Sequence, residues 1–312
     1  MDFTTFARAH GVIIDRLRDD GQWHRVPTSE KPHKRNGAYR FMGDVGFVQD
    51  WGSMTEAAVW HPDGDSPVQQ IDREAIARRA REQAEEIRRK QARAAQRAAD
   101  IMAATGPGRH PYLESKGFPE EVGALWHDED EDDVKLCIPM YVGRALVGVQ
   151  TISGKRAHQA QRRGELVDVP DFEKRFLPGQ RIDLSAFTFG QRGPLLLAEG
   201  YATALSARRA MEALRQPFRL VVTFNAGNMR KVARAFEEER QAGIVIADND
   251  LPSKQYPDAG GAGIATAKMI GWPFWQSDRA PEDANDFERR RGYFALTMGL
   301  KPLVMRQHAR RA

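Results

Sequence analysis

The last third of the sequence alternates short apolar runs with longer segments of helical periodicity, and this alternation constrains the fold more than any other feature. The runs PLLLA, FRLVVTF and GIVIA have the length of buried strands and cover 194–198, 218–224 and 243–247. Helical segments separate them and a further extended segment follows, at 201–214, 228–240, 261–270 and 273–276. Strands that alternate with helices in this way predict a parallel sheet with helices on both faces.

Two of these predicted strands end directly in carboxylates. Glu199 follows the first run, and Asp248 and Asp250 follow the third. Because the carboxyl ends of parallel strands meet at one edge of an open sheet, we expect the three side chains at the same edge. They would repel one another without a cation, and Mg²⁺ commonly binds one or two carboxylates together with substrate phosphates. Two plainer interpretations stay open: Glu199 as a cap for the next helix, and the aspartates as an ordinary turn.

Composition limits the class of protein. A length of 312 residues predicts roughly two domains, and 47 Lys and Arg against 43 Asp and Glu leave a net charge of +4, too small to indicate nucleic acid by itself. The single cysteine, Cys137, excludes an internal disulfide and any metal site built from several cysteines. The sequence has neither an apolar run of membrane-spanning length nor a signal-peptide pattern, so we expect a cytoplasmic protein without a membrane partner.

Composition and turn signals divide the chain into five segments. A small β-rich module comes first, with a helix predicted over residues 1–20, and a long charged helix rich in Ala, Arg, Glu and Gln connects it to the rest. An α+β segment then precedes the parallel sheet, and a basic tail follows the sheet. The predicted bounds, in chain order, are 1–66, 67–104, 105–190, 191–290 and 291–312.

The first segment mixes aromatic and cationic residues. Trp23, Arg25, Tyr39 and Arg40 are candidates for contact with single-stranded DNA, because aromatic rings stack on bases and Arg neutralises phosphates. The alternative is that the aromatic residues form the core of a small sheet. The segment holds no cysteine, and its histidines alone cannot complete a structural zinc site, so no zinc is expected.

Basic residues gather in two further places. Lys155 and Arg156 lie in a basic loop, and the tail from Arg289 to the C-terminus carries seven Lys and Arg without an acid. Such residues can neutralise a nucleic-acid backbone, and the tail fits a disordered solubilising segment equally well. The acidic run at 127–133 predicts an exposed loop, which we expect to lie away from any nucleic acid.

Seven short motifs occur in a fixed order between residues 110 and 292: HPYLESKGF, GVQTISG, EKRFLPG, AEGYATALSA, TFNAGNM, IVIADND and DANDFERRRG. This series resembles the Toprim-domain DNA primases of phages and conjugative plasmids, over roughly 105–292 and more weakly over 20–60. The resemblance implies a Toprim-type parallel sheet flanked by helices, preceded by an α+β primase subdomain, a long helix and a small N-terminal module. Related primases carry a zinc ribbon in that N-terminal position, and this chain departs from them there.

The resemblance also assigns roles to the acidic residues. It implies that Glu199 acts near the primer hydroxyl or a metal, and that Asp248 and Asp250 bind Mg²⁺ or Mn²⁺. Asp286 matches a later acidic position that supports the metal site. Glu199, Asp248 and Asp250 are therefore the predicted catalytic residues, and all four acids are predicted metal ligands.

Nucleotide and template contacts are predicted on both sides of these acids. Lys174 and Arg175 match the family's basic strand, which holds the nucleoside triphosphate and the template, and Lys155 is expected to add to it. Asn225 and Asn228 follow the second predicted strand, where they could hydrogen-bond a sugar or a phosphate. Their alternative role is as turn and N-cap residues of the next helix.

The activity that the resemblance implies is the synthesis of short RNA primers on single-stranded DNA from ribonucleoside triphosphates, in a bacterial host cell, for phage or plasmid replication. The sequence contains no P-loop motif, so a replicative helicase would act in trans. Two alternatives stay open. One is a Toprim metallonuclease in which the same acids activate water, and the other is a non-catalytic replication adaptor that binds single-stranded DNA.

Overall fold

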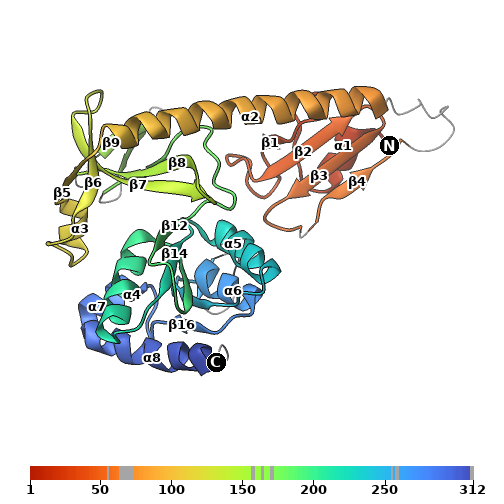
Figure 1. Cartoon of the computed structure of the whole chain (residues 1–312). Helices are drawn as coiled ribbons and strands as arrows, with labels where there is room; N and C mark the ends of the chain where they lie inside the picture. The colour runs from red at the N-terminus through yellow and green to blue at the C-terminus, as the bar shows by residue number, and fades with distance from the viewer. Residues whose placement is uncertain are drawn as a thin grey trace. The chain divides into compact units, whose positions relative to one another are not determined.

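A computed structural model gives the fold of the chain, which divides into two compact units, Met1–Glu82 and Gln83–Ala312 (Figure 1). The structure describes residues 1–54, 56–62, 73–155, 159–162, 165–168, 172–253, 256 and 260–309. In these ranges no helix has both the length and the apolar character needed to cross a membrane.

The first unit is built on an antiparallel sheet with the strand order β1-β2-β3-β4. The strands are β1 (His24–Val26), β2 (Gly37–Met42), β3 (Val45–Asp50) and β4 (Ala58–Trp60). Helix α1 (Phe3–Ala9) packs on one face of the sheet, where Phe3, Tyr39 and Val48 are buried. Gly46 permits this close packing, because a Cβ at its position would lie 2.1 Å from the Phe3 ring.

Helix α1 is much shorter than the helix predicted over residues 1–20. Asp2 caps its start by accepting a hydrogen bond of 2.8 Å from the Thr5 N–H. The helix ends before Gly11, whose φ of +75° is a left-handed conformation that a helix cannot continue through. The apolar residues beyond this point join the core from an extended segment, in which Val12 is buried and bridges to Thr28.

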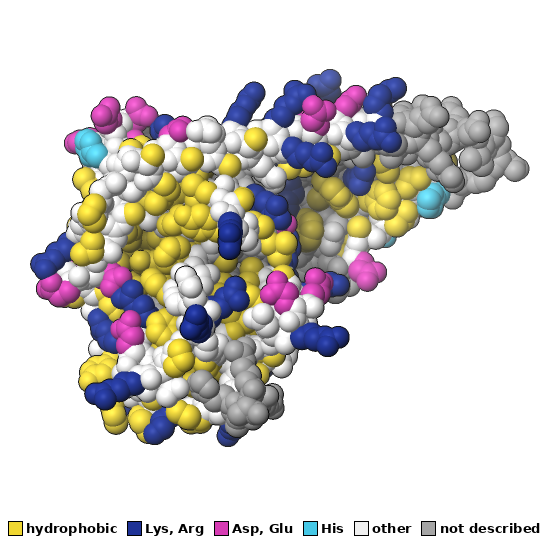
Figure 2. All heavy atoms as spheres, viewed as in Figure 1, with side chains coloured by type: hydrophobic (Ala, Val, Ile, Leu, Met, Phe, Trp, Pro, Cys, Tyr) yellow, Lys and Arg dark blue, Asp and Glu magenta, His cyan; other side chains and the backbone are white. Residues whose placement is uncertain are grey.

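Helix α2 (Arg73–Ala103) occupies most of the range for which the composition predicts a long charged helix. Acidic and basic side chains cover its exposed surface (Figure 2), with ion pairs from Glu85 to Arg89 and from Glu86 to Lys90. The last turns of α2 also contribute side chains to a hydrophobic core. Ala98 and Ile101 are buried there in a cluster with two residues of the next sheet, Cys137 and Val149.

The second unit begins with an antiparallel sheet in the order β11-β8-β7-β6-β5. Its members are β5 (Gly106–Gly108), β6 (Gly123–Asp128), β7 (Asp133–Val142), β8 (Ala145–Ile152) and β11 (Lys174–Phe176), with helix α3 (Pro111–Ser115) between β5 and β6. A separate hairpin pairs β9 (Gln159–Arg162) with β10 (Glu165–Asp168). The sheet brings the basic strand β11 beside β8, with Arg175 opposite Thr151.

The other sheet of this unit has the order β12-β14-β13-β15-β16, and all its pairings are parallel except that of β12. Its strands are β12 (Phe187–Phe189), β13 (Leu195–Ala198), β14 (Arg219–Val222), β15 (Ile244–Ala247) and β16 (Phe274–Gln276). Helices α4 (Tyr201–Ala213), α5 (Ala226–Glu238) and α6 (Gly261–Ile270) connect the parallel strands. Leu196 and Ala198 join the core on the α4 side, whereas Leu195 and Leu197 pack with residues of α5 and α6. The predicted parallel sheet with helices on both faces is therefore present.

Two predicted boundaries are wrong. Strand β12 lies before residue 191 yet pairs with β14, so the sheet begins earlier than predicted. The predicted basic tail holds a helix, α8 (Tyr293–Ala309), which follows α7 (Ala284–Arg291) and packs on α4. Leu296, Leu300 and Val304 are fully buried at a spacing of four residues, so an apolar stripe fixes α8 in the core despite its basic residues.

Candidate active site

The predicted acidic edge forms where β13 and β15 end. These strands are hydrogen-bonded neighbours, with Ala198 opposite Ile246, so Glu199 and Asp248 leave adjacent strands at the same end. Asp250 follows two residues later. The three carboxylates influence one another electrostatically, since Glu199 and Asp250 both raise the pKa of Asp248.

Asp248 is the most perturbed group of this edge. Burial raises its pKa well above the usual value, and the charges of Asp283, Glu199 and Asp250 raise it further, while Lys174 opposes them. Its Oδ1 atom is buried and has no hydrogen-bond partner within the described part of the chain. A buried carboxylate oxygen without a donor is costly, so this position favours a ligand that brings positive charge.

Glu199 does not cap the helix that follows it. The N-cap of α4 is Gly200, which makes no side-chain capping bond, so this alternative is wrong. Burial raises the pKa of Glu199, and Asp250 raises it further, whereas Lys174 and a backbone hydrogen bond at Ala226 lower it. The side chain therefore belongs with the acidic edge.

The start of α6 packs against the acidic edge and contacts Asp248 and Asp250. Asp250 Oδ2 accepts a hydrogen bond of 3.1 Å from the Gly263 N–H, so one of its oxygens also serves the turn into α6. A Cβ on Gly263 would lie 2.2 Å from the Asp248 carbonyl oxygen, and only glycine permits this approach. The glycines of 260–263 thus hold α6 against the acidic strand end, a role that strand and helix periodicity did not reveal.

A fourth carboxylate joins the edge, and it differs from the predicted one. Asp283 is the N-cap of α7, accepts a hydrogen bond of 2.8 Å from the Asp286 N–H, and exerts the largest charge effect on Asp248. The predicted ligand Asp286 is exposed. Burial raises its pKa, as does Asp283, while Lys116 lowers it. The resemblance to Toprim primases offers Asp283 as a second match to the same acidic position, beside the predicted ligand Asp286.

Lys174 faces the acidic edge, as expected. Its pKa is lowered because surrounding protein displaces water from the ammonium, while attraction to Asp283, Asp248 and Glu199 opposes this. The residue is nevertheless exposed, and its Nζ lies 5.3 Å from the centre of the Tyr112 ring. Tyr112 is buried, which raises its pKa to about 12, and it was not predicted as part of the site. Lys174 therefore remains accessible to an anion that approaches the carboxylates.

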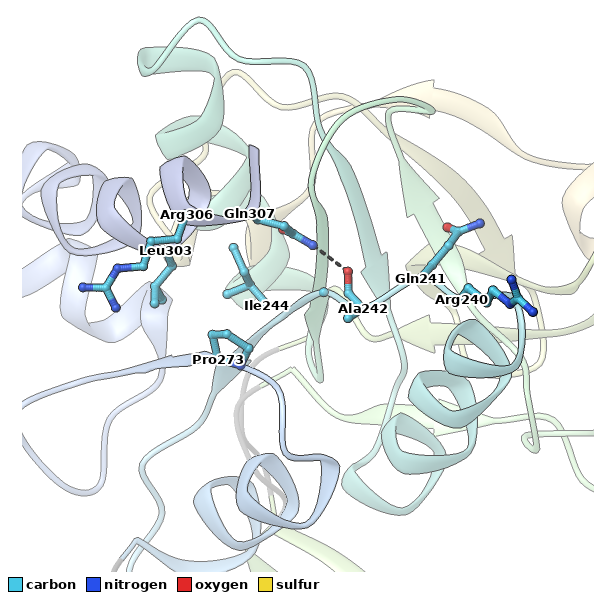
Figure 3. Close-up of a pocket in the computed structure, with 9 residues that line it drawn as sticks. Arg240, Gln241, Ala242, Ile244, Pro273, Leu303, Arg306 and Gln307 are labelled. Atoms are coloured by element: carbon cyan, nitrogen blue, oxygen red, sulfur yellow. Dashed lines mark hydrogen bonds between the residues drawn. The ribbon is translucent and has the colours of Figure 1, made fainter. Parts of the chain in front are cut away.

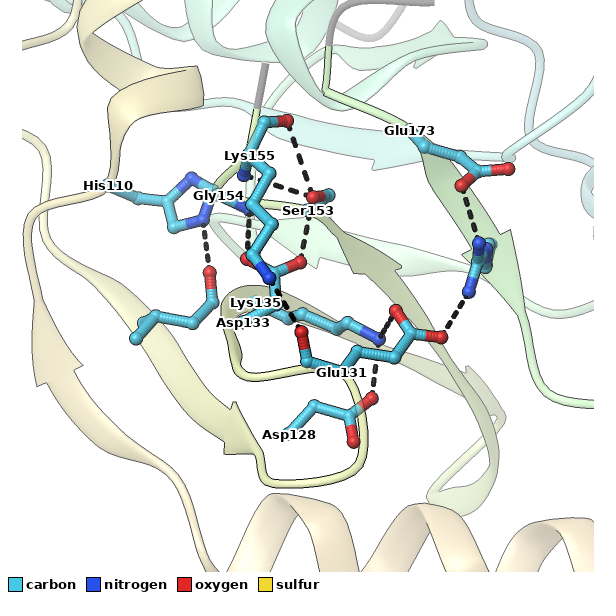
Figure 4. A network of polar contacts seen from close by, with 11 residues as sticks. His110, Asp128, Glu131, Asp133, Lys135, Ser153, Gly154, Lys155 and Glu173 are labelled. Carbon is cyan, nitrogen blue, oxygen red and sulfur yellow. Dashed lines mark hydrogen bonds and ion pairs between the residues drawn. The ribbon is translucent and has the colours of Figure 1, made fainter. Parts of the chain in front are cut away.

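Arg175 and Lys155 lie in a different network, around the acidic run (Figure 4). Arg175 pairs with Glu131 and with Glu173, and Lys155 Nζ donates a hydrogen bond of 2.6 Å to the Glu131 carbonyl oxygen. Adjacent strand residues point to opposite faces, so Arg175 points away from the face that Lys174 occupies. Contact of Lys155 and Arg175 with nucleotide or template stays a prediction, and Arg156 lies outside the described residues.

The acidic run forms the predicted exposed loop, because residues 129–132 are an exposed turn between β6 and β7, and some of its acids also take part in a polar network. Lys135, which is buried, forms ion pairs with Asp128 and Glu131, and the Ser153 hydroxyl donates to Asp133 at 2.7 Å. Glu131, Asp133 and Lys135 line a cavity of about 260 Å³ together with Ser153, Lys155 and Arg175. The network therefore closes the turn between β6 and β7.

The two asparagines have structural roles. Asn225 is the N-cap of α5, and its Oδ1 accepts a hydrogen bond of 2.8 Å from the Asn228 N–H. Asn228 is buried, and its side-chain amide bonds to the backbone of Leu184, Ser185 and Thr223. The predicted alternative as a turn and cap residue is correct for Asn225, whereas the Asn228 side chain is held inside the fold by its three hydrogen bonds to the backbone.

The aromatic candidates of the first unit divide between two faces of its sheet. Tyr39 is only 1% exposed, and its hydroxyl donates to the Arg16 carbonyl and accepts from the Arg18 N–H, both at 3.0 Å. It is a core residue, and the prediction that it contacts DNA is wrong. Trp23 and Arg25 are exposed, and Arg40 is partly exposed.

The predicted set of four metal ligands does not converge. Within the described ranges, no group of three or more His, Cys, Asp or Glu side chains is arranged to hold an ion. The unpartnered Asp248 oxygen and the repulsion around it still fit a divalent cation held by one or two carboxylates, with phosphates and water completing the shell. Binding of a magnesium or manganese ion at this edge by one or two carboxylates stays a prediction.

A separate cavity of about 270 Å³ lies at the opposite end of β15 (Figure 3). Gly243 and Ile244 line it together with Leu303, Arg306 and Gln307 of α8, and Gln307 Nε2 donates to the Ala242 carbonyl at 2.6 Å. It is remote from the acidic edge along the strand and shares no residue with it.

Comparison with known proteins does not assign the chain to a family. No protein-family model matches the sequence, and no curated protein matches it. The chain is similar to one from a solved bacteriophage T7 complex, described as lagging-strand DNA polymerase interacting with primase domains of two gp4 subunits bound to an RNA/DNA hybrid and dTTP. The TM-score is 0.38 at 11% identity, and the match covers 62% of this chain and 84% of that chain. A likeness of this size does not establish a shared fold.

Proposed function

We propose that the chain is a Toprim-type DNA primase, which synthesises short RNA primers on single-stranded DNA from ribonucleoside triphosphates. The observation that carries this proposal is the group of carboxylates at the ends of β13 and β15. Glu199, Asp248, Asp250 and Asp283 form no ion pair among the described residues, although burial and mutual repulsion raise the pKa of Asp248. The order of the sequence motifs supports the same family.

The reaction would be nucleotidyl transfer. The 3′-hydroxyl of one ribonucleotide attacks the α-phosphorus of the next, the bond to pyrophosphate breaks, and the hydroxyl proton is released. Such a reaction depends on in-line positioning and on neutralising charge more than on covalent catalysis. A bound Mg²⁺ or Mn²⁺ would supply that neutralisation and polarise the phosphate.

Each residue of the edge has a task in this proposal. Asp248 and Glu199 would hold the ion, because they leave neighbouring strands at the same end. Asp250 would keep one oxygen on the α6 turn and offer the other to the site. Lys174 would bind the triphosphate, since it is exposed while lying close enough to the acids to be attracted by them. Asp283 would hold α7 against the site through its cap.

The biological setting belongs to the same proposal. The motif order indicates replication of a phage or plasmid in the cytoplasm of a bacterial host, with the single-stranded template opened by a helicase that acts in trans. Because the first unit lacks cysteine, no zinc is needed for template contact.

The test is a priming assay with matched variants. Single-stranded DNA, Mg²⁺ or Mn²⁺ and labelled ribonucleotides are incubated with the wild-type protein, with Asp248→Asn and with Asp128→Asn. We expect labelled oligoribonucleotides from the wild type and from Asp128→Asn, and none from Asp248→Asn. Asp128 is the matched control because it is an acid of the same unit whose charge is paired with Lys135.

Two other outcomes would replace the proposal. Metal-dependent cutting of the DNA without RNA synthesis would indicate a Toprim metallonuclease that uses the same acids on water. DNA binding with neither product, unchanged by Asp248→Asn, would indicate a replication adaptor without catalysis.

A further inference from the structure

The sheet of the first unit has one covered face and one open face. Strand pairing places His24, Tyr39, Val48 and Ala58 in one row across the sheet, on the side where α1 packs. The neighbouring rows point the other way. We call the surface formed by Trp23, Arg25, Arg40, Phe47, Gln49, Trp51 and Val59 the open face.

Aromatic rings and guanidinium groups alternate on the open face. The Trp23 and Phe47 rings have their centres 6.4 Å apart, and Arg40 lies opposite Phe47 in the strand pairing. The Arg25 guanidinium lies 5.1 Å from the centre of the Trp51 ring. Each exposed indole thus has an aromatic or cationic neighbour on the same surface.

Exposure of these rings is unusual for this chain. Of its six tryptophans, only Trp23 at 47% and Trp51 at 54% fall among the exposed residues, and both lie on the open face. Val59 on the same face is 47% exposed. Large aromatic side chains gathered on one surface of a small unit indicate an interaction site.

Charge distinguishes the kind of partner. The strand positions that point outward carry two arginines and no acid: Arg25, Ala38, Arg40, Met42, Val45, Phe47, Gln49 and Val59. The Arg40 Nε atom is buried and has no acceptor among the described residues. A face that carries aromatic rings and guanidinium groups matches a ligand with stacking surfaces and anionic acceptors, whereas an apolar helix would leave the arginines without an anionic partner.

We propose that the open face binds single-stranded nucleic acid, with bases stacked on Trp23 and Trp51 and phosphates held by Arg25 and Arg40. Stacking and phosphate contact tolerate any sequence, so the site would bind strands of mixed composition. A duplex would bind poorly, because its bases already stack on one another. This inference does not depend on the proposed catalytic activity.

The test measures binding to the full-length protein in EDTA, so that primer synthesis is not involved. The probes are a fluorescein-labelled dT 20-mer, an rU 20-mer and a 20-base-pair duplex, followed by anisotropy and by tryptophan fluorescence. We expect Trp51→Ala and Trp23→Ala each to weaken binding of the single strands by about 5-fold or more, the range measured for one base stacked on one ring. Trp51→Phe keeps a ring and should stay within about 2-fold of wild type.

Two further variants separate stacking from charge. Arg25→Gln should lower the slope of log Kd against log salt by about 0.7, the value for one phosphate contact on a single strand. Leu17→Ala removes an exposed apolar side chain of the same unit outside the sheet and should have no effect. If Trp51→Ala or Trp23→Ala does not fold, the salt dependence of Arg25→Gln carries the test.

Three results would overturn the inference. Equal affinity of Trp51→Ala, Trp23→Ala and the wild type for the single strands would mean that the open face does not contact the strand. Equal loss of single-strand and duplex binding would mean that only charge is involved. A change in oligomeric state of the tryptophan variants, without a change in affinity for the probes, would identify the face as a protein interface. Asp248→Asn should bind the probes as the wild type does, so failure of priming and failure of this inference remain distinguishable.

Discussion

The second unit contains two groups of acidic residues with opposite surroundings. At the ends of β13 and β15, burial and neighbouring carboxylates raise the pKa of Asp248 and of Glu199. In the turn between β6 and β7, burial alone would raise the pKa of Asp128, but its hydrogen bond from Lys135 lowers it, and the same lysine lowers the pKa of Glu131. The first group forms no ion pair among the described residues, although Lys174 partly offsets its charge, whereas Asp128 and Glu131 of the second group are paired with Lys135.

This difference shows that acidic content alone is a poor guide to a site. The run HDEDEDD is the most acidic stretch of the sequence, yet Asp128 and Glu131 within it pair with Lys135 and Arg175. The acids of the strand ends are fewer and scattered along the chain. The parallel sheet brings them to one edge, where they form no ion pair among the described residues.

The largest effect should come from removing one charge of the group at the ends of β13 and β15. Asp248→Asn is expected to reduce primer synthesis about 1000-fold, the upper range for one preorganised electrostatic group. Its thermal midpoint in EDTA should be unchanged or higher, because the substitution relieves repulsion from Asp283 and Glu199. Initial rates and thermal scans measure both. A variant that loses stability together with activity would show that Asp248 is a structural residue.

The paired group should respond in stability instead. Lys135→Met leaves Asp128 and Glu131 without their buried partner and should lower the free energy of unfolding by about 3 kcal/mol. Lys155→Met is the control, because Lys155 is exposed, and it should cost less than about 1 kcal/mol. Urea unfolding measures both variants. Equal losses would mean that the buried ion pairs do not stabilise the turn.

Sequence reasoning located the acidic edge because parallel strands have a direction. Glu199 and Asp248 each follow a short apolar run, and parallel pairing then places them at one end of the sheet. The contribution of Asp283 could not be read in this way, since it depends on where α7 packs. The buried helix α8 was missed for a different reason, because its basic residues outweighed the spacing of Leu296, Leu300 and Val304.

The alternation of side chains along a strand bears on two pairs of predicted residues. Lys174 and Arg175 were grouped together, as were Tyr39 and Arg40, yet each pair occupies neighbouring positions on a strand. Side chains alternate between the faces of a sheet, so one member of each pair points away from the surface that the other occupies. The composition of a strand shows which functional groups it carries. The alternation of side chains between the two faces of the sheet decides which of these groups reach a given surface.

The two cations that sequence analysis grouped together should therefore separate in kinetics. Lys174→Ala is expected to raise KM for ribonucleoside triphosphates about 10-fold, the loss of one phosphate contact of about 1.4 kcal/mol. Arg175→Ala should leave KM within about 2-fold, because its guanidinium pairs with Glu131 and Glu173. Steady-state rates over a range of nucleotide concentrations measure both. A larger KM effect for Arg175→Ala would place the nucleotide on the other face of β11.

The smallest effect is a difference in pH dependence, and its sign distinguishes the two groups. The pKa of Asp248 is raised in the folded protein above its usual value of 3.8, so the folded state binds more protons and the wild type loses stability as pH rises through that window. Asn cannot titrate, and the stability advantage of Asp248→Asn over the wild type should grow by about 1 kcal/mol or more between pH 4 and pH 8.

Asp128 should behave in the opposite sense. Its folded pKa lies below 3.8, so its charge stabilises the protein above that pH and the contribution is lost as pH falls through the lowered value. The deficit of Asp128→Asn relative to the wild type should therefore be constant from pH 5 to pH 8 and shrink towards pH 3. Urea unfolding in EDTA across this range measures both variants. If both differences changed in the same direction with pH, the contrast between an unpaired and a paired group of acids would be wrong.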